Sequence, residues 1–297
     1  MERLFIFLQH LVPQHGLSRL VAIFANSQYS FIKTPFIRFF IKRYQVDMSE
    51  AMITNIAQFK NFNDFFTRQL KNDARPISPG TDLVVSPADG AISELGPIQS
   101  DSLLQAKGRT FSAAELLGGI TEDAESFRDG SFITIYLSPR DYHRVHMPVA
   151  GTLQKTVYVP GKLFSVNQAT ANAVPNLFSR NERLVCFFET DLGPMALVLV
   201  GAMIVAGIET VWSGQVCPNK HGRLESDYLN HTPPIELDKG SEMGRFWLGS
   251  TVILLFGPGA IALNKELHNG HAIRLGEPLA TTNPLVTTTE PLAMIIK

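Results

Sequence analysis

Apolar clusters separated by basic and helix-breaking residues occupy the first 60 positions of the chain. Phe, Leu and Ile are their main residues, and the mixture of apolar and basic positions is typical of amphipathic helices. No cluster reaches the roughly 20 apolar residues of a membrane-spanning helix, because Pro, Gly, Arg and Lys interrupt each run. The clusters lie at 4–8, 20–24, 36–37 and 39–41. The pattern predicts helices that lie on a surface rather than cross a bilayer.

After residue 60 the pattern changes to short β-branched and aromatic runs punctuated by Gly and Pro, which predicts strands. Asn61 is placed to cap a short helix, and Ser112 with Glu115 forms a capping box for another. The predicted strands lie at 83–85, 91–92, 132–137, 184–188 and 196–200. The fold class we expect is α+β, mainly β: packed antiparallel sheets over residues 61–297, preceded by amphipathic helices within residues 1–60.

Residues 246–264 form an uncharged stretch of 19 positions, so length alone would nominate a transmembrane helix. Gly249 and the Gly-Pro-Gly turn at 257–259 favour a buried strand, a turn and a second strand instead. Gly249 also leaves its own carbonyl sterically open, so that the hydroxyl of Ser250 could attack it. The alternative is an ordinary buried strand interrupted by small residues.

Charge is unevenly distributed along the chain. Residues 1–46 hold six basic residues and one acidic residue, whereas the whole chain has a net charge of −1 and a pI near 6.7. The overall balance gives no reason to propose nucleic acid as a partner. The basic amphipathic segment suits an anionic membrane surface, and packing against the body or a second subunit is the alternative. Cys186 and Cys217 lack CxxC spacing and suggest neither a disulfide framework nor a zinc knuckle, which fits a reducing compartment.

Three further polar residues of the β-rich body are candidates for a catalytic role. Asp89 precedes Gly90 between two apolar runs, and such a pair is foremost a hairpin-turn signal. His143 and His146 are bracketed by prolines, so a strand or loop is expected, and in an extended segment the two rings face opposite sides. That geometry disfavours a metal site, since no third ligand follows at a usual spacing. With Ser250, these residue types are the parts of a Ser-His-Asp relay.

Together, these stretches resemble the phosphatidylserine decarboxylase family. The resemblance runs from about Phe62 to the C-terminus, and the order and number of the motifs make it specific. Its strongest motifs are Ser-Pro-Ala-Asp-Gly at 86–90, Asp-Tyr-His-Arg-Val-His-Met-Pro at 141–148 and Leu-Gly-Ser-Thr at 248–251. Shorter matches are Phe-Phe-Thr-Arg at 65–68, Lys-Gly at 107–108 ahead of Phe-Ser at 111–112, and Pro-Gly-Lys-Leu-Phe-Ser-Val-Asn at 160–167.

The resemblance implies that the chain cuts itself between Gly249 and Ser250. In this family the serine attacks the preceding glycine carbonyl, β-elimination breaks the resulting ester, and the new terminal dehydroalanine hydrolyses to a pyruvoyl group with loss of ammonia. Carried over, the products are a large chain (1–249) and a small chain (250–297), which stay associated. Asp89, His146 and Ser250 are then the residues of maturation.

The resemblance also implies the activity: decarboxylation of phosphatidylserine to phosphatidylethanolamine and CO2 by a covalent pyruvoyl cofactor derived from Ser250, with neither metal nor pyridoxal phosphate. The ketone forms a Schiff base with the substrate amine and takes up the electron pair released with CO2. His143 is expected to protonate the α-carbon. Tyr142 and Arg144 are weaker candidates for orienting the carboxylate or phosphate, and Phe164 for lining the head-group pocket.

The implied partners are phosphatidylserine in an anionic membrane and a second copy of the chain in a homodimer, without nucleic acid. The implied location is peripheral, on the cytoplasmic face of a bacterial inner membrane. A membrane-associated Ser-His-Asp hydrolase is the alternative function, although no Gly-x-Ser-x-Gly elbow surrounds Ser250. A non-enzymatic lipid-binding module would leave the three strongest motifs unexplained.

Overall fold

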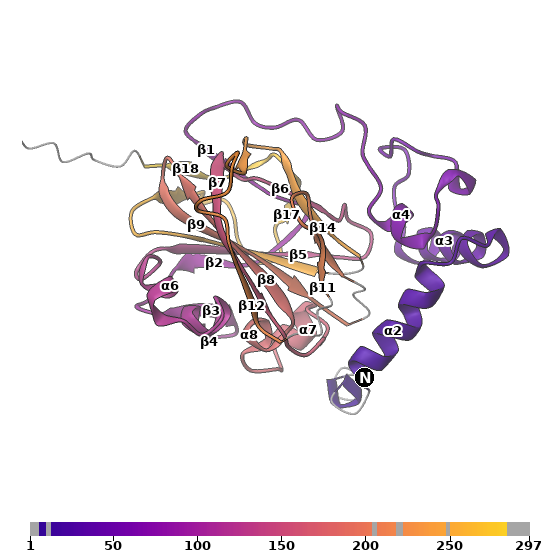
Figure 1. Ribbon diagram of the computed structural model, residues 1–297, viewed down its shortest axis with the longest axis horizontal. Helices are drawn as coiled ribbons and strands as arrows, with labels where there is room; N and C mark the ends of the chain where they lie inside the picture. The colour runs from indigo at the N-terminus through magenta and orange to yellow at the C-terminus, as the bar shows by residue number, and fades with distance from the viewer. Residues whose placement is uncertain (1–5, 10–12, 204–206, 218–221, 248–249, 284–297) are drawn as a thin grey trace, which may run out of the picture.

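The computed structural model describes residues 6–9, 13–203, 207–217, 222–247 and 250–283, and it places a group of helices beside a β-rich body (Figure 1). Residues 6–9 are helical. The helices that follow are α2 (Gln14–Ala25), α3 (Ser30–Tyr44), the 3₁₀ turn η1 (Ile56–Gln58) and α4 (Phe62–Phe66). The mainly β fold preceded by N-terminal helices is as predicted.

The N-terminal helices have a core of their own, built largely from phenylalanine. Ile37 and Phe40 of α3 pack against four buried phenylalanines of the next segment: Phe59, Phe62, Phe65 and Phe66. The Asn61 side chain accepts a hydrogen bond from the Asp64 N–H at 2.9 Å, which confirms the predicted cap of α4. This cluster connects the basic segment to the body.

A nine-stranded antiparallel sheet forms the centre of the body. Its strand order is β12-β7-β8-β9-β15-β5-β2-β17, with β13 also paired to β7. The strands are β2 (Gly90–Pro97), β5 (Ser131–Leu137), β7 (Gly151–Val159), β8 (Arg183–Thr190), β9 (Gly193–Gly201), β12 (Leu224–Asp227), β13 (Glu236–Leu237), β15 (Ser250–Phe256) and β17 (Ala272–Ile273).

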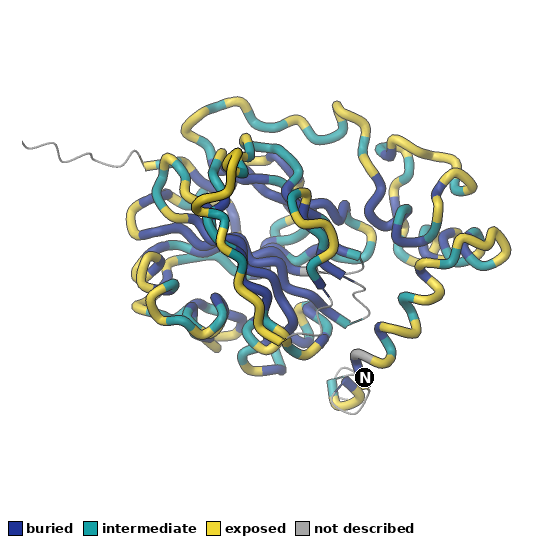
Figure 2. The backbone as a smooth tube through the Cα atoms, viewed as in Figure 1, coloured by how far each residue is buried: buried dark blue, intermediate teal, exposed yellow. Residues whose placement is uncertain are grey.

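The uncharged stretch is explained by the position of β15, which lies between β9 and β5. Val252 and Leu254 face one hydrophobic core, whereas Ile253 and Leu255 face the other. A strand with both faces covered reads as a continuous apolar run rather than an alternating one. Figure 2 shows these central strands buried along their length, whereas the N-terminal helices carry exposed stretches.

Smaller elements cover the faces and edges of the large sheet. The Ser112 side chain accepts from the Glu115 N–H, which confirms the predicted helix start. The covering helices are α5 (Ala113–Leu116), α6 (Thr121–Glu125), α7 (Gln168–Ala171) and α8 (Leu177–Arg180). A two-stranded sheet joins β3 (Ser102–Ala106) to β4 (Arg109–Ser112), and a three-stranded sheet has the order β1 (Leu83–Val85), β18 (Pro278–Thr282), β16 (Ile261–Leu263).

The hairpin expected at Asp89 and Gly90 is wrong. β1 pairs with β18, whereas β2 pairs with β5 and β17, so the bend between them moves the chain from one sheet to another. An Asp-Gly pair favours a turn locally, but the partner of each strand is decided by distant segments.

A second sheet has four strands in the order β11-β10-β14-β6. Three of these strands, β10, β14 and β6, are each next along the chain to a strand of the large sheet. Its strands are β6 (Arg144–His146), β10 (Ile208–Thr210), β11 (Gly214–Cys217) and β14 (Glu242–Phe246). The neighbours β9, β15 and β5 of one sheet connect directly to the neighbours β10, β14 and β6 of the other. Three connections, called crossings below, therefore link the two sheets: β5 to β6, β14 to β15 and β9 to β10.

Candidate active site

The middle crossing contains the Gly249–Ser250 bond. Ser250 begins β15, and its backbone pairs with Leu137 on one side and Gly201 on the other. Just before the bond, the Phe246 N–H donates to the His143 carbonyl at 3.0 Å and the Trp247 N–H donates to the Gly207 carbonyl at 2.9 Å. The backbone is thus held on both sides of the crossing. Leu248, Gly249 and the Ser250 side chain lie outside the described residues.

His143 lies on the adjacent crossing and is fully buried. Its ring stacks on Phe66 of α4, with 3.9 Å between ring centroids. Neither ring nitrogen has a hydrogen-bond partner among the described residues. Burial, with a smaller effect from the charge of Arg68, lowers the pKa of His143 to about 3, although the nearby carbonyls of Ser138 and Pro139 act in the opposite direction. The ring is therefore neutral near pH 7.

His146 ends β6 and faces the other side, as expected for residues three apart in an extended segment. Its Nδ1 lies 2.8 Å from the Gly240 carbonyl, and its Nε2 lies 3.2 Å from the Tyr142 hydroxyl. Because a carbonyl only accepts, Nδ1 carries the proton and Nε2 accepts from the tyrosine. Burial lowers the pKa of His146, which favours the neutral form that a general base needs.

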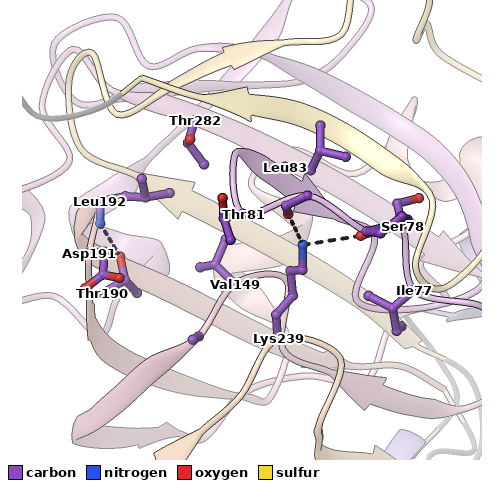
Figure 3. A pocket seen from close by; sticks show the side chains of 13 residues that line it. Ile77, Ser78, Thr81, Leu83, Val149, Thr190, Asp191, Leu192, Lys239 and Thr282 are labelled. Atoms are coloured by element: carbon purple, nitrogen blue, oxygen red, sulfur yellow. Dashed lines mark hydrogen bonds between the residues drawn. The ribbon is translucent and has the colours of Figure 1, made fainter.

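The turn that contains Gly240 is held in place by hydrogen bonds of the neighbouring Lys239. Figure 3 shows Lys239 extending toward the loop at 78–80, where its ammonium donates to the carbonyls of Ser78 and Gly80. Ile77 lines both the cavity of about 390 Å³ on that side and a cavity of about 340 Å³ beside His146. The carbonyl that determines the His146 tautomer is thus part of a fixed turn.

Asp89 lies just before β2, at the same end of the sheet as Ser250. Its carboxylate binds the Arg75 guanidinium, with the Nε at 2.8 Å, and accepts the Leu275 N–H at 2.9 Å. Arg75 also binds Glu50 at 2.8 Å. Among the described residues, no hydrogen bond joins Asp89 to either histidine. The direct Asp89–His146 contact of a relay is therefore not formed here, because Arg75 occupies the carboxylate.

The weaker candidates are distributed around these groups. Arg144 donates to the Thr67 carbonyl at 2.9 Å and pairs with Glu242 at 2.7 Å, so its charge is already compensated. Tyr142 is buried, which raises the pKa of its phenol, and its hydroxyl contacts His146. This places Tyr142 against His146.

Phe164 is buried and joined to the site through one side chain. Asn181 accepts from the Phe164 N–H at 3.1 Å and donates to both the Phe164 carbonyl and the Gly201 carbonyl, at 2.8 and 2.9 Å. Gly201 in turn pairs with Ser250. The segment around Phe164 is therefore held beside the start of β15.

Sequence reasoning missed Arg75, Gly240 and Phe66 as residues that shape the site. Phe66 belongs to a motif that carried the resemblance, but nothing in the sequence shows that it stacks on His143. Arg75 and Gly240 have no local signal, since their contacts with Asp89 and His146 span 14 and 94 positions.

Two further features of the described residues bear on other kinds of site. No cluster of three or more His, Cys, Asp or Glu side chains suited to a metal ion occurs among them. Within the same residues, no helix has the length and apolar character needed to cross a membrane.

Comparison with known proteins gives a consistent result. The family model described as phosphatidylserine decarboxylase matches residues 62–281, and a model named PSD matches residues 4–45. The phosphatidylserine decarboxylase proenzyme of Alcanivorax borkumensis is 56% identical over 284 residues, covering 95% of this chain and 97% of that protein. That of Pseudomonas fluorescens is 55% identical with 95% and 99% coverage, and that of Pseudomonas aeruginosa is 56% identical with 94% and 97%. The chain belongs to the phosphatidylserine decarboxylase family.

Proposed function

We propose that this protein is a self-processing enzyme that decarboxylates phosphatidylserine to phosphatidylethanolamine and CO2. The observation that carries the proposal is its identity of 56% to a phosphatidylserine decarboxylase proenzyme over 95% of the chain. The relatives reported above are named decarboxylase proenzymes, so the serine hydrolase alternative has no support from them. The crossing that holds Ser250 supplies the structural part of the argument.

Maturation begins with attack by the Ser250 hydroxyl on the Gly249 carbonyl. His146 takes the hydroxyl proton on Nε2. The Tyr142 hydroxyl, which donates to Nε2, must first move away from it. The Gly240 carbonyl keeps Nδ1 protonated throughout. The anchored Trp247 and the paired backbone of Ser250 hold the two sides of the bond while it is cut. The products are residues 1–249 and 250–297.

The residues around Ser250 fit a pyruvoyl group formed from it. The buried His143 ring, with two nitrogens that lack partners among the described residues, lies on the neighbouring crossing and is free to bond to a group at that position. When present, the pyruvoyl group supplies a ketone that accepts the substrate amine and the electrons released with CO2. His143 is the proposed source of the proton for the α-carbon, which requires its ring to gain a proton during turnover, since burial keeps it neutral near pH 7 before substrate binds. Phe164, which Asn181 joins to Gly201, is the proposed contact for the head group, and Arg144 lines the cavity beside His146.

The experiment for this function is intact mass combined with CO2 release. The wild-type protein should give two chains split before Ser250, and Ser250→Ala should give one inactive chain near 32.8 kDa. The adjacent Thr251→Val is the matched control and should be cut. Two chains from Ser250→Ala would remove Ser250 from the scheme, and an active uncut wild type would remove self-processing.

Residues 1–60 are proposed to hold the enzyme on the cytoplasmic face of the inner membrane as a homodimer. Ile23, Phe31 and Phe39 are 69%, 76% and 63% exposed, and Lys42 and Arg43 end α3. Exposed apolar side chains near basic ones suit an anionic lipid surface. Serine at the three apolar positions should reduce sedimentation with phosphatidylglycerol vesicles, and unchanged sedimentation would refute the role. Substitution is preferable to deletion because α3 packs on the cluster that contains Phe66.

A further inference from the structure

The motif at 65–68 contains an arginine whose surroundings the scheme above does not explain. Arg68 is 5% exposed. Its Nη2 donates to the Arg140 carbonyl at 3.2 Å, and its Nε has no hydrogen-bond partner in the described part of the chain. No carboxylate of the described residues lies within ion-pair distance of it. Burying a guanidinium without an anion is unfavourable, and an arginine does not escape by losing its proton.

Another buried arginine shows what a purely structural role looks like. Arg183 is 2% exposed and has no carboxylate partner among the described residues either. Each of its three nitrogens donates to backbone carbonyls, among them those of Leu116 at 2.7 Å and Asn181 at 2.9 Å. Arg68 makes one such bond. Its donors are therefore left available, whereas those of Arg183 are used.

Arg68 is among the residues that line a cavity of about 370 Å³, together with Asp89 and Tyr142. Three other arginines line the same cavity, and each pairs with a carboxylate: Arg75 with Asp89 and Glu50, Arg140 with Asp141, and Arg274 with Glu50. Arg68 is the arginine of this wall that lacks an ion pair among the described residues. The cavity is large enough for a phosphate or carboxylate group with its neighbouring atoms.

The cavity is also close to the proposed proton donor. Arg68 follows Phe66 by two positions, Phe66 stacks on His143, and the Arg68 charge contributes to the lowered pKa of that histidine. An anion bound at Arg68 would lie within electrostatic reach of His143.

We propose that Arg68 and this cavity bind an oxyanion of the substrate head group, either the phosphodiester or the serine carboxylate. The inference rests on the proposed function and adds a binding residue to it. A forked guanidinium suits both oxyanions because it offers two parallel donors. An anion bound there would also offset the Arg68 charge, which is the smaller cause of the lowered pKa of His143 after burial.

The test uses processed enzyme and a short-chain, water-soluble phosphatidylserine. Arg68→Met should be cut normally and raise KM on the order of tenfold or more, the loss expected for a charge-assisted bond. Arg128→Met is the control: its exposed side chain pairs with Glu125 and does not line this cavity, and KM should stay within about twofold. An unchanged KM in Arg68→Met overturns the inference while leaving an active wild-type enzyme, and an inactive wild type would instead overturn the proposed function.

Inhibition by the corresponding phosphatidylethanolamine distinguishes the two oxyanions, because the product keeps the phosphate and lacks the carboxylate. Weaker inhibition of Arg68→Met than of wild type assigns the phosphate, and equal inhibition with raised substrate KM assigns the carboxylate. If Arg68→Met does not fold, Arg68→Lys carries the test, since lysine keeps the charge without the fork. A raised KM in a normally cut Arg68→Lys supports the site, and an unchanged KM refutes it.

Discussion

His143 and His146 are three residues apart, and the structure gives them opposite surroundings. His143 is fully buried against Phe66 with two ring nitrogens that lack partners among the described residues, whereas His146 is partly buried and has a partner on each nitrogen. A ring with both nitrogens engaged has a defined tautomer, which suits one proton transfer in a fixed direction. A ring with free nitrogens can bond to a group that forms later. The difference indicates separate tasks rather than a shared one.

Replacing each histidine separately should produce the largest effects. His146→Ala should leave an uncut chain, because no base remains for Ser250. His143→Ala should be cut normally and lose decarboxylation by roughly 10²–10⁴-fold, the usual contribution of a general acid. Gel pattern and CO2 release, measured on both variants, check the assignment. An uncut His143→Ala beside a cut His146→Ala would reverse the roles, and two uncut proteins would show that the rings act together in maturation.

A smaller effect is expected from the ion pair beside His146. Asp89→Asn and Arg75→Met should slow cleavage by similar factors, on the order of ten, because one buried pair positions both side chains and either substitution leaves the other uncompensated. The first-order rate of chain cleavage after expression in vitro is the measurement. Exposed Arg128→Met is the control. Cleavage blocked in Asp89→Asn but normal in Arg75→Met would show that Asp89 acts on His146 directly.

The smallest effect concerns acid stability. The unfolded chain protonates His143 near pH 6.5, whereas the folded chain does so only near pH 3, so the unfolded state binds more protons between these values. The unfolding free energy should therefore fall as pH drops below about 6.5, by up to roughly 1.4 kcal/mol per pH unit from this ring alone. The stabilising effect of a neutral His143 is present above that pH.

Urea unfolding of Ser250→Ala protein between about pH 7 and pH 5 measures this slope in a single uncut chain. Adding His143→Gln should flatten it. Adding His146→Gln should flatten it less, because that ring is partly exposed and hydrogen-bonded. Equal flattening by the two substitutions would contradict the contrast in burial.

Much of the local structure was predictable because its causes are local. The caps at Asn61 and Ser112 act within three residues, and the strands at 132–137 and 196–200 are apolar because both faces of the sheet are covered. The opposite orientation of the two histidines follows from the geometry of any extended segment. The hairpin at Asp89 failed for the complementary reason, since strand pairing depends on residues far away.

The sequence by itself determined which residue types are available for chemistry, that a Gly-Ser bond lies within an uncharged stretch, and which family the motifs resemble. Only the tertiary structure decided that the Ser250 backbone pairs with both Leu137 and Gly201. It also decided that the Gly240 carbonyl bonds to His146 and that Arg75 pairs with the Asp89 carboxylate. Turn and cap preferences act over a few neighbouring residues, whereas hydrogen bonds between distant segments exist only after the sheets have assembled. The candidate site depends on such bonds, because its residues come from segments that are far apart in the sequence.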